Sequence, residues 1–139
     1  MIRFLIPGLR LVSEANAHGY WRERHARSQA QRTAAKLTTA ASLAGDRPAE
    51  RLSTEPLVVT IVRIAPGRCW LDSDNLVGSA KHVRDGVADA LGVNDRDTRV
   101  TWHVEQRKGA GTEHAVEVTI AARETCPHCG AVVRERGAA

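Results

Sequence analysis

The spacing of apolar residues predicts where strands and helices lie in this chain. The run at 57–64 (Leu-Val-Val-Thr-Ile-Val-Arg-Ile) is nearly continuous in apolar residues, as is typical of a strand covered on both faces in the middle of a sheet. Apolar residues at every second position predict two later strands with one buried face each. Their buried sets are Val100, Trp102 and Val104, then Val116, Val118 and Ile120. Residues 1–6 predict a first strand, which ends at the turn signal Pro7-Gly8.

Two main helices are predicted between these strands. Residues 21–41 contain no Pro or Gly and are rich in Ala, Arg and Gln, which favours a long helix. A second helix with one buried face is indicated by apolar residues three or four apart, namely Leu76, Ala80, Val83, Val87 and Leu91. We expect Asp74 or Asn75 to cap its start and Gly92 its end. The order β, α, β, α, β, β predicts an α/β fold with a mixed sheet and helices packed on it, and the two glycines of 108–112 predict a hairpin loop.

Length and composition are those of one ordinary globular domain. The chain has 139 residues, 42% hydrophobic and 26% charged, and we expect a domain at 1–123 followed by a tail at 124–139. No apolar run approaches the length of a membrane span, and residues 1–7 lack the features of an export signal. The odd count of three cysteines suits a reducing compartment, so we expect a cytoplasmic protein without a membrane. A formal charge of +4 mildly favours a polyanionic partner.

Two carboxylates stand two residues apart where the apolar strand region meets the second helix. In extended backbone, Asp72 and Asp74 would project to the same side and converge on one hard cation such as Mg²⁺. Without a cation, their mutual repulsion would raise the pKa of at least one carboxyl. The alternative interpretation is a polar turn that caps a helix, because Asp-rich turns before helices are common.

The pattern around these carboxylates resembles the RusA-type Holliday junction resolvases, the crossover junction endodeoxyribonucleases. The resemblance consists of Asp-Ser-Asp-Asn at 72–75, then Lys81 and Asp85 on the helix, and the acidic turn Asn-Asp-Arg-Asp at 94–97 before a strand. The entry into the first helix is also similar, with Pro7-Gly8, Ser-Glu-Ala-Asn at 13–16 and Tyr-Trp-Arg at 20–22. Together these segments cover roughly residues 1–123.

The resemblance implies a metal-dependent nuclease with a defined set of site residues. Asp72, Asp74 and one of Asp95 or Asp97 would hold Mg²⁺, and Lys81 would stabilise charge on the phosphate. Lys81 lies about two turns after Asp74, so its side chain must reach far along the helix or the helix must start later. Such a resolvase acts as a homodimer on branched DNA, a four-way junction, by metal-assisted phosphodiester hydrolysis. The alternative role for Lys81 and Asp85 is a surface ion pair.

Basic residues on the first helix are the candidates for contacts with DNA phosphates. They are Arg22, Arg24, Arg27 and Lys36. Their positions are distributed around the helix, so a solvated helix with ordinary surface charge is the competing interpretation.

The tail contains half of a zinc site. Cys126-Pro-His-Cys129 has the spacing with which two thiolates grip one Zn²⁺. Two more ligands would have to come from Cys69, His114, His128 or a second protomer. Two functional alternatives to the nuclease therefore stay open: a non-catalytic DNA-binding accessory protein with the same fold, and a small zinc-binding interaction module.

Overall fold

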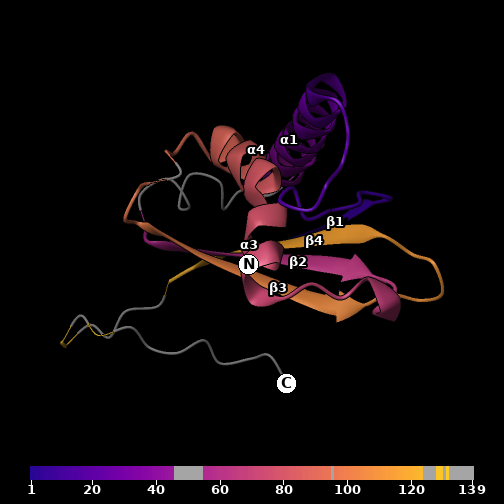
Figure 1. The fold of residues 1–139 in the computed structure, drawn as a ribbon. Helices are drawn as coiled ribbons and strands as arrows, with labels where there is room; N and C mark the ends of the chain where they lie inside the picture. Colours follow the sequence, from indigo (N-terminus) through magenta and orange to yellow (C-terminus); the bar gives the residue numbers. More distant parts are fainter. Residues whose placement is uncertain (46–54, 95, 124–127, 130, 132–139) are drawn as a thin grey trace.

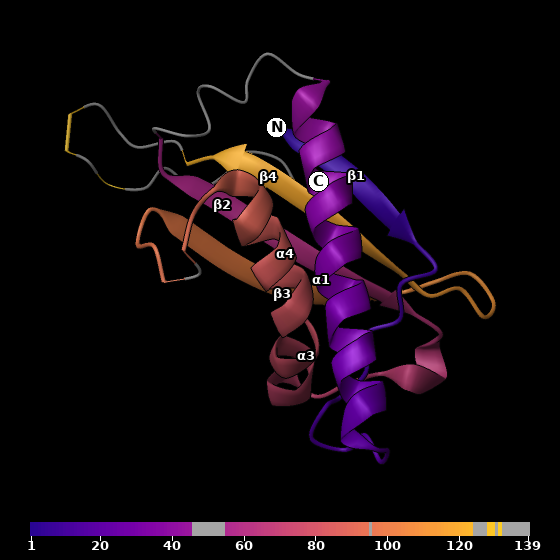
Figure 2. The same cartoon turned by 90° about the horizontal axis from the view of Figure 1, so that it is seen from above.

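A four-stranded mixed sheet carries three α-helices on one face (Figures 1 and 2). The structure is a computed structural model that describes residues 1–45, 55–94, 96–123, 128, 129 and 131. Its elements are β1 (Ile2–Pro7), α1 (Trp21–Ala44), β2 (Leu57–Ala65), the 3-10 helix η1 (Gly67–Cys69), α3 (Ser73–Ser79), α4 (Lys81–Leu91), β3 (Val100–Lys108) and β4 (Ala115–Ala122). The predicted α/β class with a mixed sheet is confirmed.

Strand β2 lies inside the sheet, as its apolar run predicts. The strand order is β1-β4-β2-β3, with β2 parallel to β3 and antiparallel to β4. Eight of the nine β2 residues are buried, and Thr60 is half-buried. The α3–α4 segment forms the crossover that a parallel pair of strands requires.

The hairpin predicted at 108–112 is wrong. Strands β3 and β4 do not pair with each other, because β2 lies between them and bonds to both. The connecting loop passes over the end of β2, where the Gly109 N–H donates to the Ala65 carbonyl at 2.8 Å. A side chain at Gly109 would meet Ile64 at 2.9 Å, so the glycine serves this close crossing rather than a hairpin turn.

The single striped helix predicted over residues 76–91 is in fact two helices. Asp72 caps α3, in place of the expected Asp74 or Asn75. At Ala80 the helix changes direction: the Ala80 N–H donates to Val77 three residues back, and the Ser79 hydroxyl donates to the Leu76 carbonyl. The apolar stripe stays buried across this break, which explains why its spacing did not reveal it. Gly92 ends α4 in the left-handed conformation, as predicted.

Helices α1 and α4 pack closely against each other above the sheet (Figure 2). A side-chain carbon on Gly86 of α4 would lie 2.3 Å from the Arg32 carbonyl of α1, so only glycine permits this approach. Buried residues four apart on α1, Gln31, Ala35 and Thr39, form its inner face. No helix in the described part of the chain is long and apolar enough to cross a membrane.

Candidate metal and nucleic-acid site

Asp72 and Asp74 lie at the start of α3, Asp72 as its N-cap and Asp74 in its first turn. Asp72 accepts from the Asn75 backbone N–H at 2.9 Å through one oxygen and from the Asn75 side-chain amide at 2.8 Å through the other. The backbone bond from Asn75, its amide bond and the Asp74 backbone N–H lower the pKa of Asp72, so this carboxyl is ionised at neutral pH. Asp74, in the first turn of α3, is exposed. Asp72 therefore acts as the cap of a polar turn before α3, as in the alternative interpretation of this segment.

The same turn is tied to the segment that precedes α1. The buried Ser13 hydroxyl donates to the Asn75 side-chain oxygen at 2.6 Å, across 62 residues of sequence. Asn75 therefore bridges Ser13 and Asp72, with its oxygen accepting from one and its amide donating to the other. Two of the segments that carry the resemblance, 13–16 and 72–75, meet in space through this contact.

A glutamine of β3 holds the approach to α3. The Gln106 amide donates to the Leu71 carbonyl at 2.6 Å, and its oxygen accepts from the Leu71 N–H at 3.2 Å. Because Gln106 pairs with Arg63 in the sheet register, these contacts place Asp72 beside the C-terminal halves of β2 and β3.

The acidic turn before β3 has a different environment. Asp97 accepts from the Arg99 guanidinium, with a shortest distance of 2.6 Å, and from the Arg99 backbone N–H at 3.0 Å. These bonds from Arg99 lower the pKa of Asp97 to about 2. The Asp97 carbonyl also accepts from the Val100 N–H at 3.1 Å, which fixes the turn to the first residue of β3. Asp95 lies outside the described residues.

The two acidic segments lie at opposite ends of β3. Asp97 is bound to Val100, whereas Leu71, next to Asp72, is bound to Gln106. Six residues of strand separate Val100 from Gln106, which is about 20 Å at ~3.3 Å per residue. Across residues 1–45, 55–94 and 96–123, no three His, Cys, Asp or Glu side chains are close enough to share a metal ion. The structure places Asp72 and Asp74 at the start of α3 and Asp97 at the opposite end of β3 within one protomer.

Lys81 lies on the polar surface of α4 that faces α1. It is the first residue of α4, so the helix that carries it does start later than the pattern predicted. It lines a polar hollow of about 420 Å³ together with Arg32, Asp85, Asp89 and Asn94. Within the described chain, no ion pair joins Lys81 to Asp85, and Asp89 is instead held by Arg32 at 2.7 Å.

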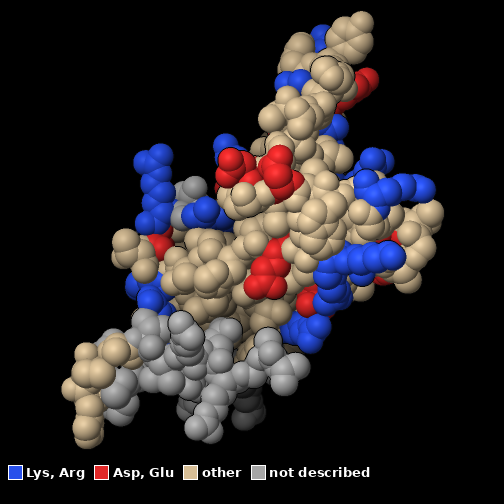
Figure 3. All heavy atoms as spheres, turned by 60° about the horizontal axis from the view of Figure 1, so that its bottom comes forward, with Lys and Arg blue, Asp and Glu red and all other residues tan. Residues whose placement is uncertain are grey.

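Two of the four basic candidates on α1 hold the preceding loop. Arg27 forms an ion pair with Glu14 at 3.1 Å, and the Arg24 guanidinium donates to the Ala17 carbonyl. Arg22 lies over the ring of Trp21 at 5.5 Å, and Lys36 is exposed. Figure 3 shows Lys and Arg in separate groups around one face of the molecule, with Asp and Glu between them, rather than as one continuous basic surface.

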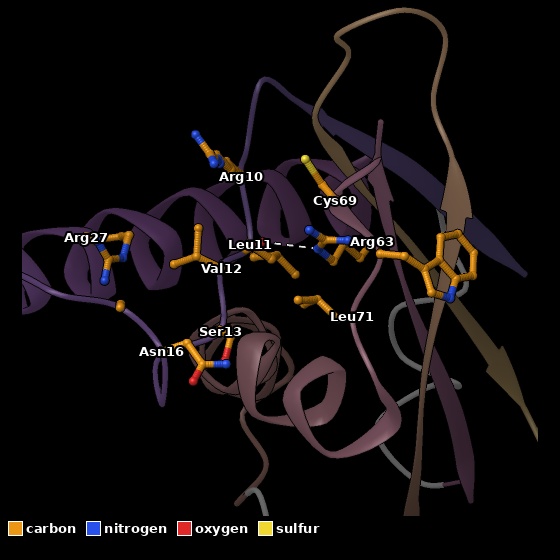
Figure 4. Close-up of a pocket in the computed structure, with 11 residues that line it drawn as sticks. Arg10, Leu11, Val12, Ser13, Asn16, Arg27, Arg63, Cys69 and Leu71 are labelled. Carbon is orange, nitrogen blue, oxygen red and sulfur yellow. Dashed lines mark hydrogen bonds between the residues drawn. The ribbon is translucent and has the colours of Figure 1, made fainter. Parts of the chain in front are cut away.

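A buried arginine next to this turn was missed by the sequence interpretation. Arg63 is only 4% exposed, and it faces the helix layer with its alternate neighbours Val59 and Ile61. Its Nε donates to the Leu11 carbonyl at 3.1 Å (Figure 4). The signal was present, since Arg63 is the one charged residue in an otherwise apolar strand.

The cysteines do not form a zinc site among the residues described. Cys69 is half-buried and lies near Arg63, Cys129 is exposed, and Cys126 falls outside the described residues. His114 is near Arg10, Arg63 and Arg68, and its pKa is lowered by burial and by these positive charges. The positive charges near Cys69 and His114 disfavour a further cation at this place.

The comparison with known proteins includes a short match to an uncharacterized protein. No family model matches the chain. A 31-residue stretch is 55% identical to an uncharacterized protein of Xylella fastidiosa. The match covers 22% of this chain and 20% of that protein.

Proposed function

We propose that this chain is a Mg²⁺-dependent endodeoxyribonuclease of the RusA type, which cuts four-way junctions or other branched DNA as a cytoplasmic homodimer. The observation that carries the proposal is the contact between Ser13 and Asn75. Two sequence segments that resemble the same family independently are joined by a 2.6 Å hydrogen bond, beside two neighbouring carboxylates. A chance likeness in each segment gives no reason for them to meet.

The donor set at the start of α3 fits a hydrated Mg²⁺. Asp72 and Asp74 offer hard oxygen ligands, and Mg²⁺ is commonly held by one or two carboxylates while it keeps several waters and binds substrate phosphate oxygens. The set does not fit a closed cage of protein ligands, because the described residues supply no third carboxylate here. When bound, the ion supplies an activated water and neutralises charge on the phosphate.

The residues around the carboxylates act by positioning them. Asn75 fixes both oxygens of Asp72, so this side chain keeps one orientation and stays ionised. Ser13 orients the Asn75 amide, and Gln106 fixes the backbone of Leu71. Asp74 has no such restraint and remains open to the solvent, where a cation and a DNA phosphate can reach it.

Cleavage of a synthetic four-way junction tests this proposal. The wild-type protein should cut symmetrically with Mg²⁺ and should not cut in EDTA. Asp74→Asn removes a metal ligand without removing bulk, so we expect cleavage to fall at least about 100-fold while junction binding is retained. A variant that cuts at the wild-type rate would contradict the assignment of the site.

One observation favours a second candidate, a non-catalytic DNA-binding protein with the same fold. Asp97, which the resemblance places in the nuclease site, lies at the opposite end of β3 from Asp72 in a single protomer. Binding of the junction by the wild-type protein without any Mg²⁺-dependent cleavage would select this second function.

A further inference from the structure

A hollow of about 470 Å³ lies beside the Asp72 turn and is lined by positive charge (Figure 4). It is bounded by the segment after β1, the first turns of α1 and the connection from β2 to α3. Arg10, Arg27 and Arg63 line it, and no Asp or Glu of the described chain does. Arg27 is neutralised by Glu14, which leaves Arg10 and Arg63 as the charges that define the hollow.

Arg63 is a buried cation without a carboxylate partner. Its exposed fraction is 4%, and its contacts are the Leu11 carbonyl at 3.1 Å and the Gln106 oxygen at 3.4 Å. In the part of the chain that the structure describes, no Asp or Glu pairs with it. Burial lowers the pKa of Arg63, but a guanidinium stays protonated in proteins. A desolvated cation with only neutral partners is unfavourable, and an anion entering the hollow would remove the imbalance.

The surroundings strengthen the positive potential. Arg10 is exposed at the hollow, and its charge also lowers the pKa of Arg63 after the larger effect of burial. Arg68 adds a third positive charge near His114. Such a concentration of cations in a recess attracts anions.

An exposed aromatic ring completes the hollow. Trp70 lines it and is 57% exposed, so its ring is accessible to a ligand. Proteins bind single-stranded nucleic acid by combining positive grooves for the backbone with aromatic rings on which bases stack. Trp70 is separated from Asp72 by one residue, so a strand held here would lead to the carboxylates.

We infer that this hollow binds a phosphate group of an unpaired DNA strand on Arg63 and Arg10, with a base of the same strand stacked on Trp70. The inference rests on the proposed function, because it names the substrate contact beside the proposed metal site. Because Arg63 is recessed and the hollow carries an aromatic ring, a flexible single strand suits it better than a duplex. Branched DNA with a single-stranded arm supplies such a segment.

Binding of a twelve-nucleotide thymidine strand in EDTA, followed by fluorescence anisotropy, tests the inference without any cleavage. We expect Arg63→Gln and Trp70→Ala each to weaken binding about 10-fold, and Arg10→Ala to weaken it by a smaller factor. Arg96→Ala is the matched control. Arg96 is an exposed arginine in the loop before β3, at the end of β3 opposite to the hollow. Its affinity should stay within about twofold of wild type, apart from the general loss of one charge.

The outcomes separate the alternatives. Equal affinity of wild type, Arg10→Ala and Trp70→Ala would overturn the inference, even if Arg63→Gln failed to fold. So would a control variant that binds as weakly as the others. Inorganic phosphate is the second probe: if it binds with Arg63-dependent affinity while the strand does not bind, the hollow takes free phosphate and the inference is wrong.

Failure of the nuclease proposal gives a different result. If Asp74→Asn cuts normally, or no cleavage occurs with Mg²⁺, but strand binding in EDTA still depends on Arg63 and Trp70, the binding site stands and the proposed chemistry fails. In the opposite case, cleavage requires Asp74 but strand binding is unchanged by substitution of Arg63, Arg10 or Trp70. The nuclease proposal then stands and the inferred binding site is wrong.

Discussion

The two ends of strand β3 carry acidic residues in contrasting environments. At the Gln106 end, Asp72 and Asp74 start a helix beside a recess with unbalanced positive charge, and Asn75 bridges Asp72 to Ser13. At the Val100 end, Asp97 is neutralised by Arg99, two residues away, and closes a turn. Acidic residues at two places in a sequence pattern can therefore have different roles. Asp72 and Asp74 are open to a cation, whereas Asp97 is already paired with the Arg99 guanidinium.

The largest expected effect comes from removing the charge at each end separately. Asp72→Asn keeps a good helix cap, so the fold should persist, but junction cleavage should fall at least about 100-fold because a metal ligand is lost. Asp97→Asn should cut near the wild-type rate. Cleavage rates of the two variants on the same four-way junction provide the measurement. Loss of cleavage in Asp97→Asn with cleavage retained in Asp72→Asn would reverse our assignment of the two ends.

A smaller effect is expected from the bridge that orients Asp72. Asn75→Ala removes the acceptor for Ser13 and the amide that holds one Asp72 oxygen, so cleavage should drop about 10- to 100-fold, as for other residues that position metal ligands. Asn94→Ala removes the amide whose oxygen accepts from the Arg96 N–H in the acidic turn, and it should leave cleavage near wild type. Equal cleavage by both variants would show that the bridge is only structural.

Stability should change modestly when the tie between β3 and α3 is cut. Gln106→Ala leaves the Leu71 backbone without its two partners, so the free energy of unfolding should fall by about 1–2 kcal/mol. Urea denaturation measures this change. Glu105→Ala, an exposed change on the same strand, serves as the control and should shift it by less than about 0.5 kcal/mol. A similar loss in both variants would mean that the contact with Leu71 contributes nothing specific.

The smallest effect concerns the ionisation of Asp97. Its pKa is lowered from 3.8 to about 2 in the folded protein, so its contribution to stability is fully present above pH 3.8 and is lost as the pH falls through about 2. A carboxyl carbon-13 NMR titration should give a midpoint near 2. Replacing Arg99 with alanine should move that midpoint toward 3.8. A midpoint of 3.8 in the wild-type protein would show that Arg99 does not hold this carboxylate in solution.

Sequence periodicity predicted the elements well and their connections poorly. The apolar run of β2 and the alternation of β3 and β4 are local signals, and the strands formed where these signals lie. Which strands pair depends on contacts between distant residues, so the spacing of glycines at 108–112 suggested a hairpin that β2 in fact separates. The apolar stripe stays buried on both sides of the break at Ala80, so periodicity alone cannot reveal the break.

The helix start at the candidate site could be predicted from local sequence, because residues near a helix start are fixed by local backbone bonds. The capping residue is Asp72 instead of the expected Asp74 or Asn75. The contact of Ser13 with Asn75 and the recess around Arg63 depend on how β1, α1 and α3 fold together, which spacing does not encode. The expectation that Asp97 joins Asp72 failed within one protomer because the crossover helices carry the chain back to the far end of β3.

The most direct test of the central claim is to locate a divalent cation on the folded protein. Mn²⁺ suits the same carboxylate and water ligands as Mg²⁺ and broadens NMR signals of nearby amides, with an effect that falls steeply with distance. Substoichiometric Mn²⁺ should broaden the backbone amides of residues 73–76 first and leave those of residues 97–100 sharp. Broadening that begins at 97–100, or that is spread evenly over the chain, would contradict a metal site formed by Asp72 and Asp74.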